Sequence, residues 1–320
     1  MSFDIQPVER KNTGVMVAIF GPSKSGKTLS ALRIACGLEP DREKRGVIDS
    51  EHYRASHYGE IGFMHLDLTP PYGSLRYLEA LQAMKERGVT TVVVDSLSHE
   101  HEGVGGMLEQ HADLVAKRGQ KYSMPAWAQV KPPRRKLISW MMRSGMNIIL
   151  CFRAKDKIKP PARGEKEVQD LGSMAIGGEE FIYECLCSFL LEPGAKGVPT
   201  LNPEKPGAKL MATSVSYLSH LIAPGEQLSE VTGKRLAEWA NAGSSTAPAE
   251  TESTEDRLIA AFAAFDVTEE QLVAFIGKPL AERDAADRQS LKAAHKTLSS
   301  GEGVPWSMIA GTAATTDEPA

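Results

Sequence analysis

The chain has 320 residues, of which 42% are hydrophobic and 24% are charged, and its formal net charge is −4. This composition is that of a globular protein, and the length predicts about two domains. The acidic balance excludes nucleic-acid binding through bulk charge, so any such surface has to be local. No apolar run approaches the roughly 18 residues of a membrane span, which excludes a membrane-spanning protein.

Two further features predict a cytoplasmic location. Residues 1–11 are polar and lack the apolar core of a signal peptide. The four cysteines are scattered in apolar runs, which is typical of buried thiols in a reducing compartment rather than of disulfides or a metal site. They are Cys36, Cys151, Cys185 and Cys187.

The first predicted elements enclose a phosphate-binding pattern. Residues 15–20 are typical of a buried strand, and residues 28–38 of a helix. The segment between them matches G-x-x-x-x-G-K-[ST] in the strand–loop–helix order that this motif requires. Glycines let the backbone wrap around phosphate oxygens, and amides at a helix N-terminus attract them. The predicted nucleotide-binding residues are Gly21, Pro22, Ser23, Lys24, Ser25, Gly26, Lys27 and Thr28.

The motif implies ATP and Mg²⁺ as cofactors and gives its last two side chains roles. Lys27 is expected to neutralise the outer phosphates, which makes it a candidate catalytic residue. The Thr28 hydroxyl is expected to ligate magnesium. The alternative is a glycine- and serine-rich turn before an ordinary helix.

Strands and helices alternate after the motif. Residues 46–49, 63–66 and 91–95 are typical of strands, and residues 74–87 have helical periodicity. This alternation predicts an α/β fold with a largely parallel central sheet flanked by helices. A buried strand that ends in an acid after a phosphate loop is the Walker B pattern, so Asp95 is a second predicted magnesium ligand.

Glu51 follows the second predicted strand. Strand ends of this fold class face the nucleotide, so a carboxylate there can polarise the water that attacks the γ-phosphate. The alternative is an ordinary solvated loop acid.

Three segments resemble the core of the bacterial RecA recombinase family: I-D-S-E-H at 48–52, V-V-V-D-S at 92–96, and residues 147–155. The resemblance covers residues 15–193 and is greatest to the shorter RecA-like ATPases of bacteriophages, which are associated with single-strand annealing and recombination. It implies a RecA-like P-loop NTPase core, with Glu51 as the catalytic glutamate and Asp95 as the Walker B residue. Arg153 stands near a glutamine that senses the γ-phosphate in the family, so a catalytic phosphate contact is implied for Arg153.

The resemblance also implies where DNA binds. The family's DNA-binding loop ends in a double glycine, matched here by Gly177 and Gly178 before a predicted strand at 181–191. Residues 156–178 are accordingly expected to form a mobile loop. Residues 98–102 are interpreted as a polar loop in the place of the family's first DNA loop, because no partner cluster with zinc spacing exists.

A basic stretch favours a local nucleic-acid surface. Residues 117–155 contain no Asp or Glu but ten Lys and Arg residues, with Tyr122, Trp127 and Trp140 interleaved. Cations can follow a phosphate backbone, and exposed aromatic rings can stack on bases. In the alternative, the tryptophans are core residues in and beside a helix at 133–144, and the cations form its solvated face. The predicted DNA-binding residues are Lys131, Arg134, Arg135, Lys136, Lys155, Lys157, Lys159 and Arg163.

The C-terminal part predicts a small separate module. Residues 229–240 are typical of a helix that closes an ATPase core at 1–240, and residues 241–256 have the composition of a flexible linker. Residues 257–310 predict a helical module in which T-E-E-Q at 268–271 is a capping box. This module loosely resembles one found on phage recombination proteins. Residues 311–320 are expected to be disordered.

The sequence thus predicts a DNA-dependent ATPase, a RecA-like protein that acts on single-stranded DNA in phage-type recombination or strand annealing. Its location is cytoplasmic, in the host if a phage encodes it. Expected partners are single-stranded DNA, further copies in a homo-oligomer or filament, and a single-strand-binding protein through the C-terminal module, with no membrane. One alternative is a P-loop small-molecule kinase with a lid at 133–135. Another is a nucleotide-switched DNA-binding module without significant turnover.

Overall fold

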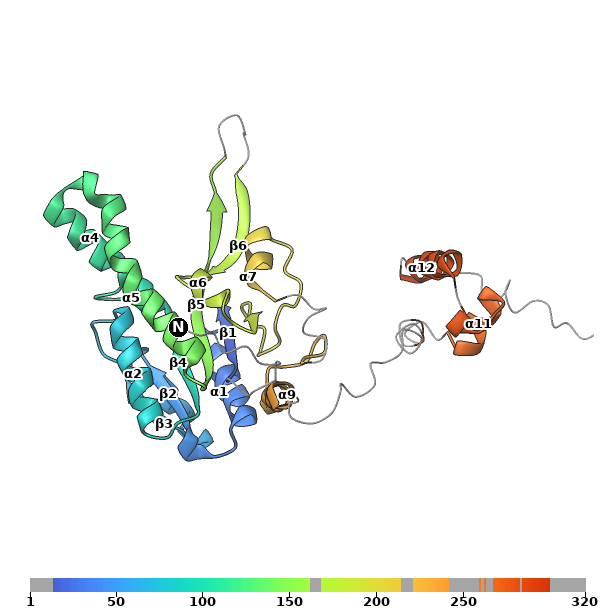
Figure 1. Cartoon of the computed structure of the whole chain (residues 1–320), viewed down its shortest axis with the longest axis horizontal. Coiled ribbons are helices and arrows are strands. Elements are labelled where there is room, and N and C mark those ends of the chain that lie inside the picture. Colours follow the sequence, from blue (N-terminus) through green and yellow to red (C-terminus); the bar gives the residue numbers. More distant parts are fainter. Residues whose placement is uncertain are drawn as a thin grey trace, which may run out of the picture. The chain divides into compact units, whose positions relative to one another are not determined.

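The computed structural model describes residues 14–161, 168–213, 221–241, 259, 262, 267–282 and 284–299 (Figure 1). The chain divides into two compact units, Met1–Ser245 and Thr246–Ala320. Several predictions fall outside the described residues: the DNA contact of Arg163, the tail at 311–320, nearly all of the linker at 241–256, and both ends of the helical module at 257–310.

A parallel sheet forms the centre of the larger unit. Its strand order is β3-β2-β4-β5-β1-β7, and β6 pairs with β5 in the antiparallel direction. The predicted α/β fold with a largely parallel sheet is therefore confirmed. The strands are β1 Met16–Gly21, β2 Arg45–Asp49, β3 Met64–Asp67, β4 Thr91–Asp95, β5 Asn147–Lys159, β6 Gln169–Ala175 and β7 Cys187–Leu190.

Both faces of the sheet are covered, which explains why strands β1 and β4 are buried along their whole length and consist mostly of apolar residues. Val92 and Val94 pack on one side with helices α2 and α5, and Val93 packs on the other with α1 and α9. Figure 1 shows the two helix layers on either side of the sheet. The helices are α1 Lys27–Leu38, α2 Ser74–Glu86, α3 Ser98–Glu102, α4 Met107–Arg118, α5 Ser123–Arg143, α6 Glu179–Ile182, α7 Pro206–Met211 and α9 Glu230–Asn241, with 3-10 turns η1 Arg42–Lys44, η2 Arg54–Ile61 and η3 Gln120–Tyr122.

A helical hairpin, residues 107–131, extends from the end of the sheet where the parallel strands finish (Figure 1). It consists of α4, η3 and the first part of α5. The expected helix start near residue 133 is wrong, because α5 begins at Ser123 and passes through Pro132 and Pro133. Each proline leaves the carbonyl four residues earlier without a helical donor, and those residues, Ala128 and Gln129, are exposed to water.

A β-hairpin extends from the same end of the sheet (Figure 1). Its paired residues run from Ala154 opposite Ala175 to Lys159 opposite Gln169. The expected mobile loop is therefore wrong for the paired residues 156–159 and 169–175. Pro160 and Pro161 follow the last paired residue of β5, so they do not interrupt the ladder.

Two other local expectations are also wrong. Residues 98–102 form helix α3 rather than a polar loop, since Ser98 and Glu100 are fully buried against the rest of the unit. The expected strand at 181–191 begins only at Cys187, because Glu179–Ile182 forms the short helix α6 with Phe181 buried at its centre.

The smaller unit has its own apolar core, which includes Phe262, Leu272, Leu280 and Leu291. The predicted capping box is present, with the Thr268 side chain accepting from the Gln271 amide and Gly277 ending the helix in a left-handed conformation. Its described elements are α11 Glu269–Ile276, η4 Leu280–Glu282 and α12 Ala285–Ser299.

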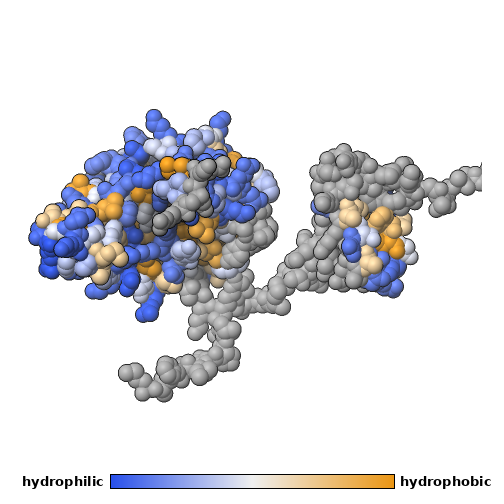
Figure 2. All heavy atoms as spheres, turned by 90° about the horizontal axis from the view of Figure 1, so that it is seen from above, coloured by the Kyte–Doolittle hydropathy of each residue, from blue (hydrophilic) through white to orange (hydrophobic). Residues whose placement is uncertain are grey.

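The surface of the larger unit, seen from above in Figure 2, is mostly hydrophilic with scattered hydrophobic groups. Within the described part of the chain, no helix has both the length and the apolar character needed to cross a membrane.

Candidate nucleotide site

The phosphate loop joins β1 to α1 at the end of the sheet. Gly21 is packed so closely that a Cβ there would lie 2.1 Å from the Leu191 carbonyl oxygen, and Gly26 adopts a φ of +96° that favours glycine. The Lys27 ammonium donates to the Pro22 carbonyl at 2.7 Å, which holds it inside the loop. Burial lowers the pKa of Lys27, because its charge has lost water. A phosphate in this loop would restore a partner to that charge.

The two predicted magnesium ligands meet each other. Thr28 Oγ1 donates to Asp95 Oδ2 at 2.5 Å, and Asp95 is almost fully buried at the end of β4. Burial raises the pKa of Asp95 to about 6. Among the described residues, no three His, Cys, Asp or Glu side chains gather to hold a metal. A hydroxyl and one carboxylate, completed by phosphate oxygens, nevertheless suit Mg²⁺, which is commonly bound this way in nucleotide sites.

Glu51 reaches the same site from the loop after β2. Asp49, which sequence reasoning did not single out, shapes this loop by accepting from the amides of Glu51 at 2.7 Å and Ala55 at 2.9 Å. The Glu51 side chain is 7% exposed and lines a cavity together with Lys27 and Asp95. The geometry therefore permits Glu51 to face a phosphate held by the loop.

Arg153 is the last residue of β5 that pairs with β1, where it lies opposite Gly21. Its guanidinium holds Glu51, with Nε 2.8 Å and Nη2 2.6 Å from Oε1. Its backbone amide donates to Ser98 Oγ at 2.9 Å, and that hydroxyl donates to the Ile176 carbonyl at the base of the β-hairpin. Arg153 thus connects the nucleotide site to the hairpin.

The cavity has a volume of about 460 Å³. Its lining adds Arg54 and Tyr58, both from η2, to the residues predicted from the sequence. Neither was predicted, because only the fold of the loop after Glu51 brings η2 to the cavity. The complete lining is Ser23, Lys24, Gly26, Lys27, Thr28, Glu51, Arg54, Tyr58, Asp95 and Arg153.

The described cations predicted to bind DNA lie on the two hairpins and in the middle of α5. Lys155 and Lys159 are exposed on β5, while Lys157 lies 3.6 Å from Glu179. Exposed cations that form no ion pair with described residues lie along the helical hairpin and the adjoining part of α5: Lys117, Arg118, Lys121, Lys131, Arg135 and Lys136. Tyr122 lies among them, with the Arg118 guanidinium 4.7 Å from its ring centre.

The tryptophans differ in their surroundings. Trp140 is partly buried and packs against the core. Trp127 is outside the core and stacks on His111, with ring centres 4.1 Å apart. Trp140 is therefore part of the packed interior, whereas one face of the Trp127 ring is covered by His111.

The prediction that Arg134 binds DNA is wrong. Its side chain is buried and forms an ion pair with Glu100, which is also buried and accepts from Ser74. If Arg134 moved away to bind DNA, the Glu100 carboxylate would remain buried without its ion-pair partner, which is costly. For the same reason Arg134 cannot act as a kinase lid cation.

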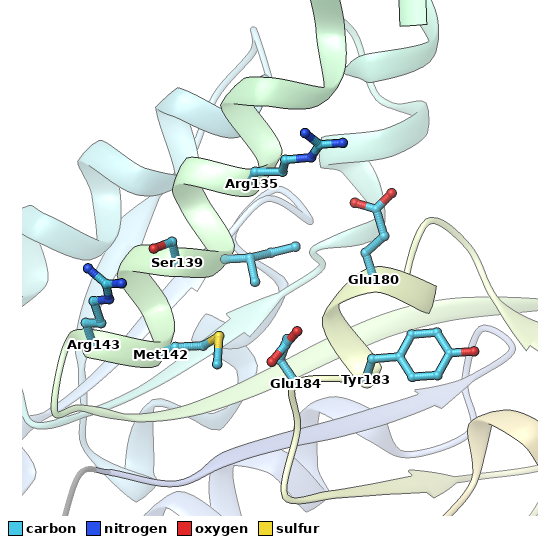
Figure 3. Close-up of a pocket in the computed structure, with 8 residues that line it drawn as sticks. Arg135, Ser139, Met142, Arg143, Glu180, Tyr183 and Glu184 are labelled. Atoms are coloured by element: carbon cyan, nitrogen blue, oxygen red, sulfur yellow. The ribbon is translucent and has the colours of Figure 1, made fainter. Parts of the chain in front are cut away.

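A second, wider hollow of about 650 Å³ lies between α5 and α6 (Figure 3). Figure 3 shows Arg135 and Glu180 pointing toward each other across it, with Met142 among the lining side chains. Its lining shares no residue with the cavity at the phosphate loop.

Comparison with known proteins identifies the family to which this chain belongs. The sequence profile of the AAA domain family matches residues 13–176, half of the chain. Over 111 residues the chain is 32% identical to Protein RecA of Helicobacter pylori (strain G27) and to that of Helicobacter acinonychis (strain Sheeba), with 32% of each chain covered. The chain thus spans about a third of the length of these relatives. The solved KaiC-like protein PH0186 of Pyrococcus horikoshii OT3 is 17% identical over 56% of this chain and 71% of its own, with a TM-score of 0.31.

Proposed function

The chain belongs to the AAA domain family, and from this premise we propose that it is a RecA-like ATPase that hydrolyses ATP while bound to single-stranded DNA. The observation that carries the proposal is one cavity lined by Lys27, Thr28, Glu51, Asp95 and Arg153. A phosphate loop, a buried acid at the end of β4 and a carboxylate after β2 are the parts that phosphoryl transfer to water requires.

Each side chain has one task in this proposal. Lys27 binds the outer phosphates, and Thr28 and Asp95 hold Mg²⁺, which would neutralise charge that develops on the phosphates. Glu51 accepts a proton from the attacking water and aims it at the γ-phosphate. Arg153 contacts the γ-phosphate. Its hydrogen bond to Ser98, which in turn bonds to Ile176, couples phosphate binding to the position of the β-hairpin.

The exposed cations of the two hairpins support single-stranded DNA as the partner. Both hairpins extend from the end of the sheet that holds the nucleotide site. The cations of the helical hairpin have no carboxylate partner among the described residues, so a phosphate backbone would supply their counter-charge. Assembly into a homo-oligomer, and recombination or annealing of phage type, belong to the same proposal and rest on the resemblance to RecA.

The deciding experiment compares steady-state ATP hydrolysis with and without single-stranded DNA at a stated salt concentration. We expect DNA to stimulate hydrolysis, and the stimulation to fall as salt rises. Turnover that ignores DNA would favour a small-molecule kinase, and nucleotide binding without turnover would favour a switch module.

Two variants assign the roles. Lys27→Ala should lose nucleotide binding because the phosphates lose their cation. Glu51→Gln should keep binding but lose turnover by about 10²–10⁴-fold, the usual contribution of a general base. Equal effects of both variants on binding would contradict the assignment.

A further inference from the structure

Both oxygens of the Glu51 carboxylate are engaged by arginines. Arg153 holds Oε1 through two nitrogens, at 2.8 and 2.6 Å, and Arg54 Nη1 lies 3.1 Å from Oε2. The His99 ring approaches Oε1 to 4.0 Å from a third side. Glu51 is thus enclosed by cationic or polar donors contributed by η2, β5 and α3.

This enclosure conflicts with the task of a general base. A carboxylate needs a free lone pair directed at the water that it deprotonates. Contacts with the two guanidinium groups occupy three of the roughly four lone-pair sites of the Glu51 carboxylate, two on Oε1 and one on Oε2. Departure of Arg54 would clear Oε2 for the water.

The two arginines are placed to move. The side chain of Arg54 is 55% exposed and that of Arg153 is 40% exposed, whereas Glu51 itself is 7% exposed. The carboxylate is therefore fixed, and the guanidiniums at the cavity wall can turn in water. The cavity is lined by four cations and two carboxylates, so its formal net charge is +2. The chemistry of the lining fits a triphosphate.

We infer that Arg54 is a phosphate-binding residue that exchanges Glu51 for the terminal phosphate of the nucleotide, and so frees the carboxylate for the water. The inference rests on the proposed ATPase function and adds a residue to that site. A terminal phosphate offers three acceptor oxygens and more charge than one carboxylate, so it competes well for a guanidinium. A nucleoside diphosphate lacks that group and leaves Arg54 on Glu51.

The test compares binding of a non-hydrolysable ATP analogue with binding of ADP, measured by calorimetry on the full chain. Arg54→Ala should lower the affinity for the analogue by at least about tenfold, the value of one charge-assisted hydrogen bond, and leave the affinity for ADP within about twofold of wild type. Glu51→Gln should raise the affinity for the analogue several-fold, because a neutral amide releases the arginines. That gain should shrink in the Arg54→Ala, Glu51→Gln double variant.

Arg76→Ala is the matched control, because Arg76 is a half-exposed arginine in an exposed pair with Glu79, and it does not line the cavity. Thermal unfolding of each variant checks the fold, and Arg54→Lys serves if Arg54→Ala is unstable. If Arg54→Ala lowers the affinities for the analogue and for ADP equally, or lowers neither, the proposed exchange is wrong. The ATPase function is unaffected by that result as long as the wild-type protein hydrolyses ATP. Wild-type protein that binds neither nucleotide would overturn the ATPase function itself.

Discussion

Single residues at the phosphate site carry charge in places where charge is costly. Asp95 and Lys27 are both more than nine-tenths buried, and burial moves their pKa values in opposite directions, up for the acid and down for the amine. Each shift disfavours the ionised form that nucleotide binding needs. The buried charges of the site therefore lower the free energy of unfolding. Bound phosphate and Mg²⁺, which carry the opposite charges, can restore it.

Asp95→Asn tests that statement through pH. The folded pKa of Asp95 is raised from 3.8 to about 6, so its ionisation destabilises the fold. The penalty is absent below pH 3.8, grows as pH rises, and is complete above about pH 6. Removing a shift of this size adds about 3 kcal/mol. We expect Asp95→Asn to raise the melting temperature by roughly 5 °C at pH 8.

The measurement is thermal unfolding in EDTA without nucleotide, at pH 4.5 and pH 8. At pH 4.5 the gain should fall to about a third of its value at pH 8, because pH 4.5 lies only a little above the unfolded pKa of 3.8. The same variant should lose ATP hydrolysis. A gain that does not change with pH would show that Asp95 is not destabilised by its charge.

The sequence predicted some of these residues and missed others for a physical reason. Lys27, Thr28 and Asp95 belong to short motifs whose geometry is local, and the structure brings them together. Arg54 reaches the cavity only through the fold of η2. The prediction for Arg134 was wrong because its partner, Glu100, lies outside the acid-free stretch in the sequence. The two residues come together only in the folded protein.

At the scale of elements, helices α1 and α9 pack with their backbones close together at Gly37 and Gly233. A Cβ on Gly37 would lie 2.0 Å from the Glu230 carbonyl oxygen and 2.8 Å from the Gly233 Cα. The two glycines therefore let the helix backbones cross without side chains between them. The composition of residues 229–240 predicted a helix, but the crossing could not be predicted because neither glycine belongs to a local motif.

Gly37→Ala should force α9 away from α1. Overpacking of this kind costs about 1–3 kcal/mol, so we expect a lower midpoint in urea unfolding with an unchanged slope. The control is Gly59→Ala, since no heavy atom lies within 4 Å of a Cβ at Gly59. If the two variants unfold at the same urea concentration, the close crossing is not a feature of the protein in solution.

At the scale of the whole molecule, the two units have separate apolar cores. The core of the smaller unit contains only residues of that unit, and the nucleotide site lies entirely within the larger one. We therefore expect the units to fold and bind independently.

Deleting residues 256–320 tests this independence. ATP affinity should stay within about twofold of the full chain, because no residue of the cavity is removed. Binding to single-stranded DNA coated with a single-strand-binding protein should weaken, because the sequence predicts that the smaller unit contacts that protein. Both affinities are measured on the two proteins under one buffer, and unchanged binding to the coated DNA would remove the recruiting role.

The continuity of β5 has a mechanical consequence. Arg153 is its last residue paired with β1, and Ala154 is its first residue paired with β6, so one unbroken strand serves both the sheet and the β-hairpin. From Ala154 to Lys159 this strand spans about 17 Å at the usual rise per residue. A tilt of about 10° at Arg153 would carry Lys159 through roughly 3 Å, because the length of this segment sets the displacement.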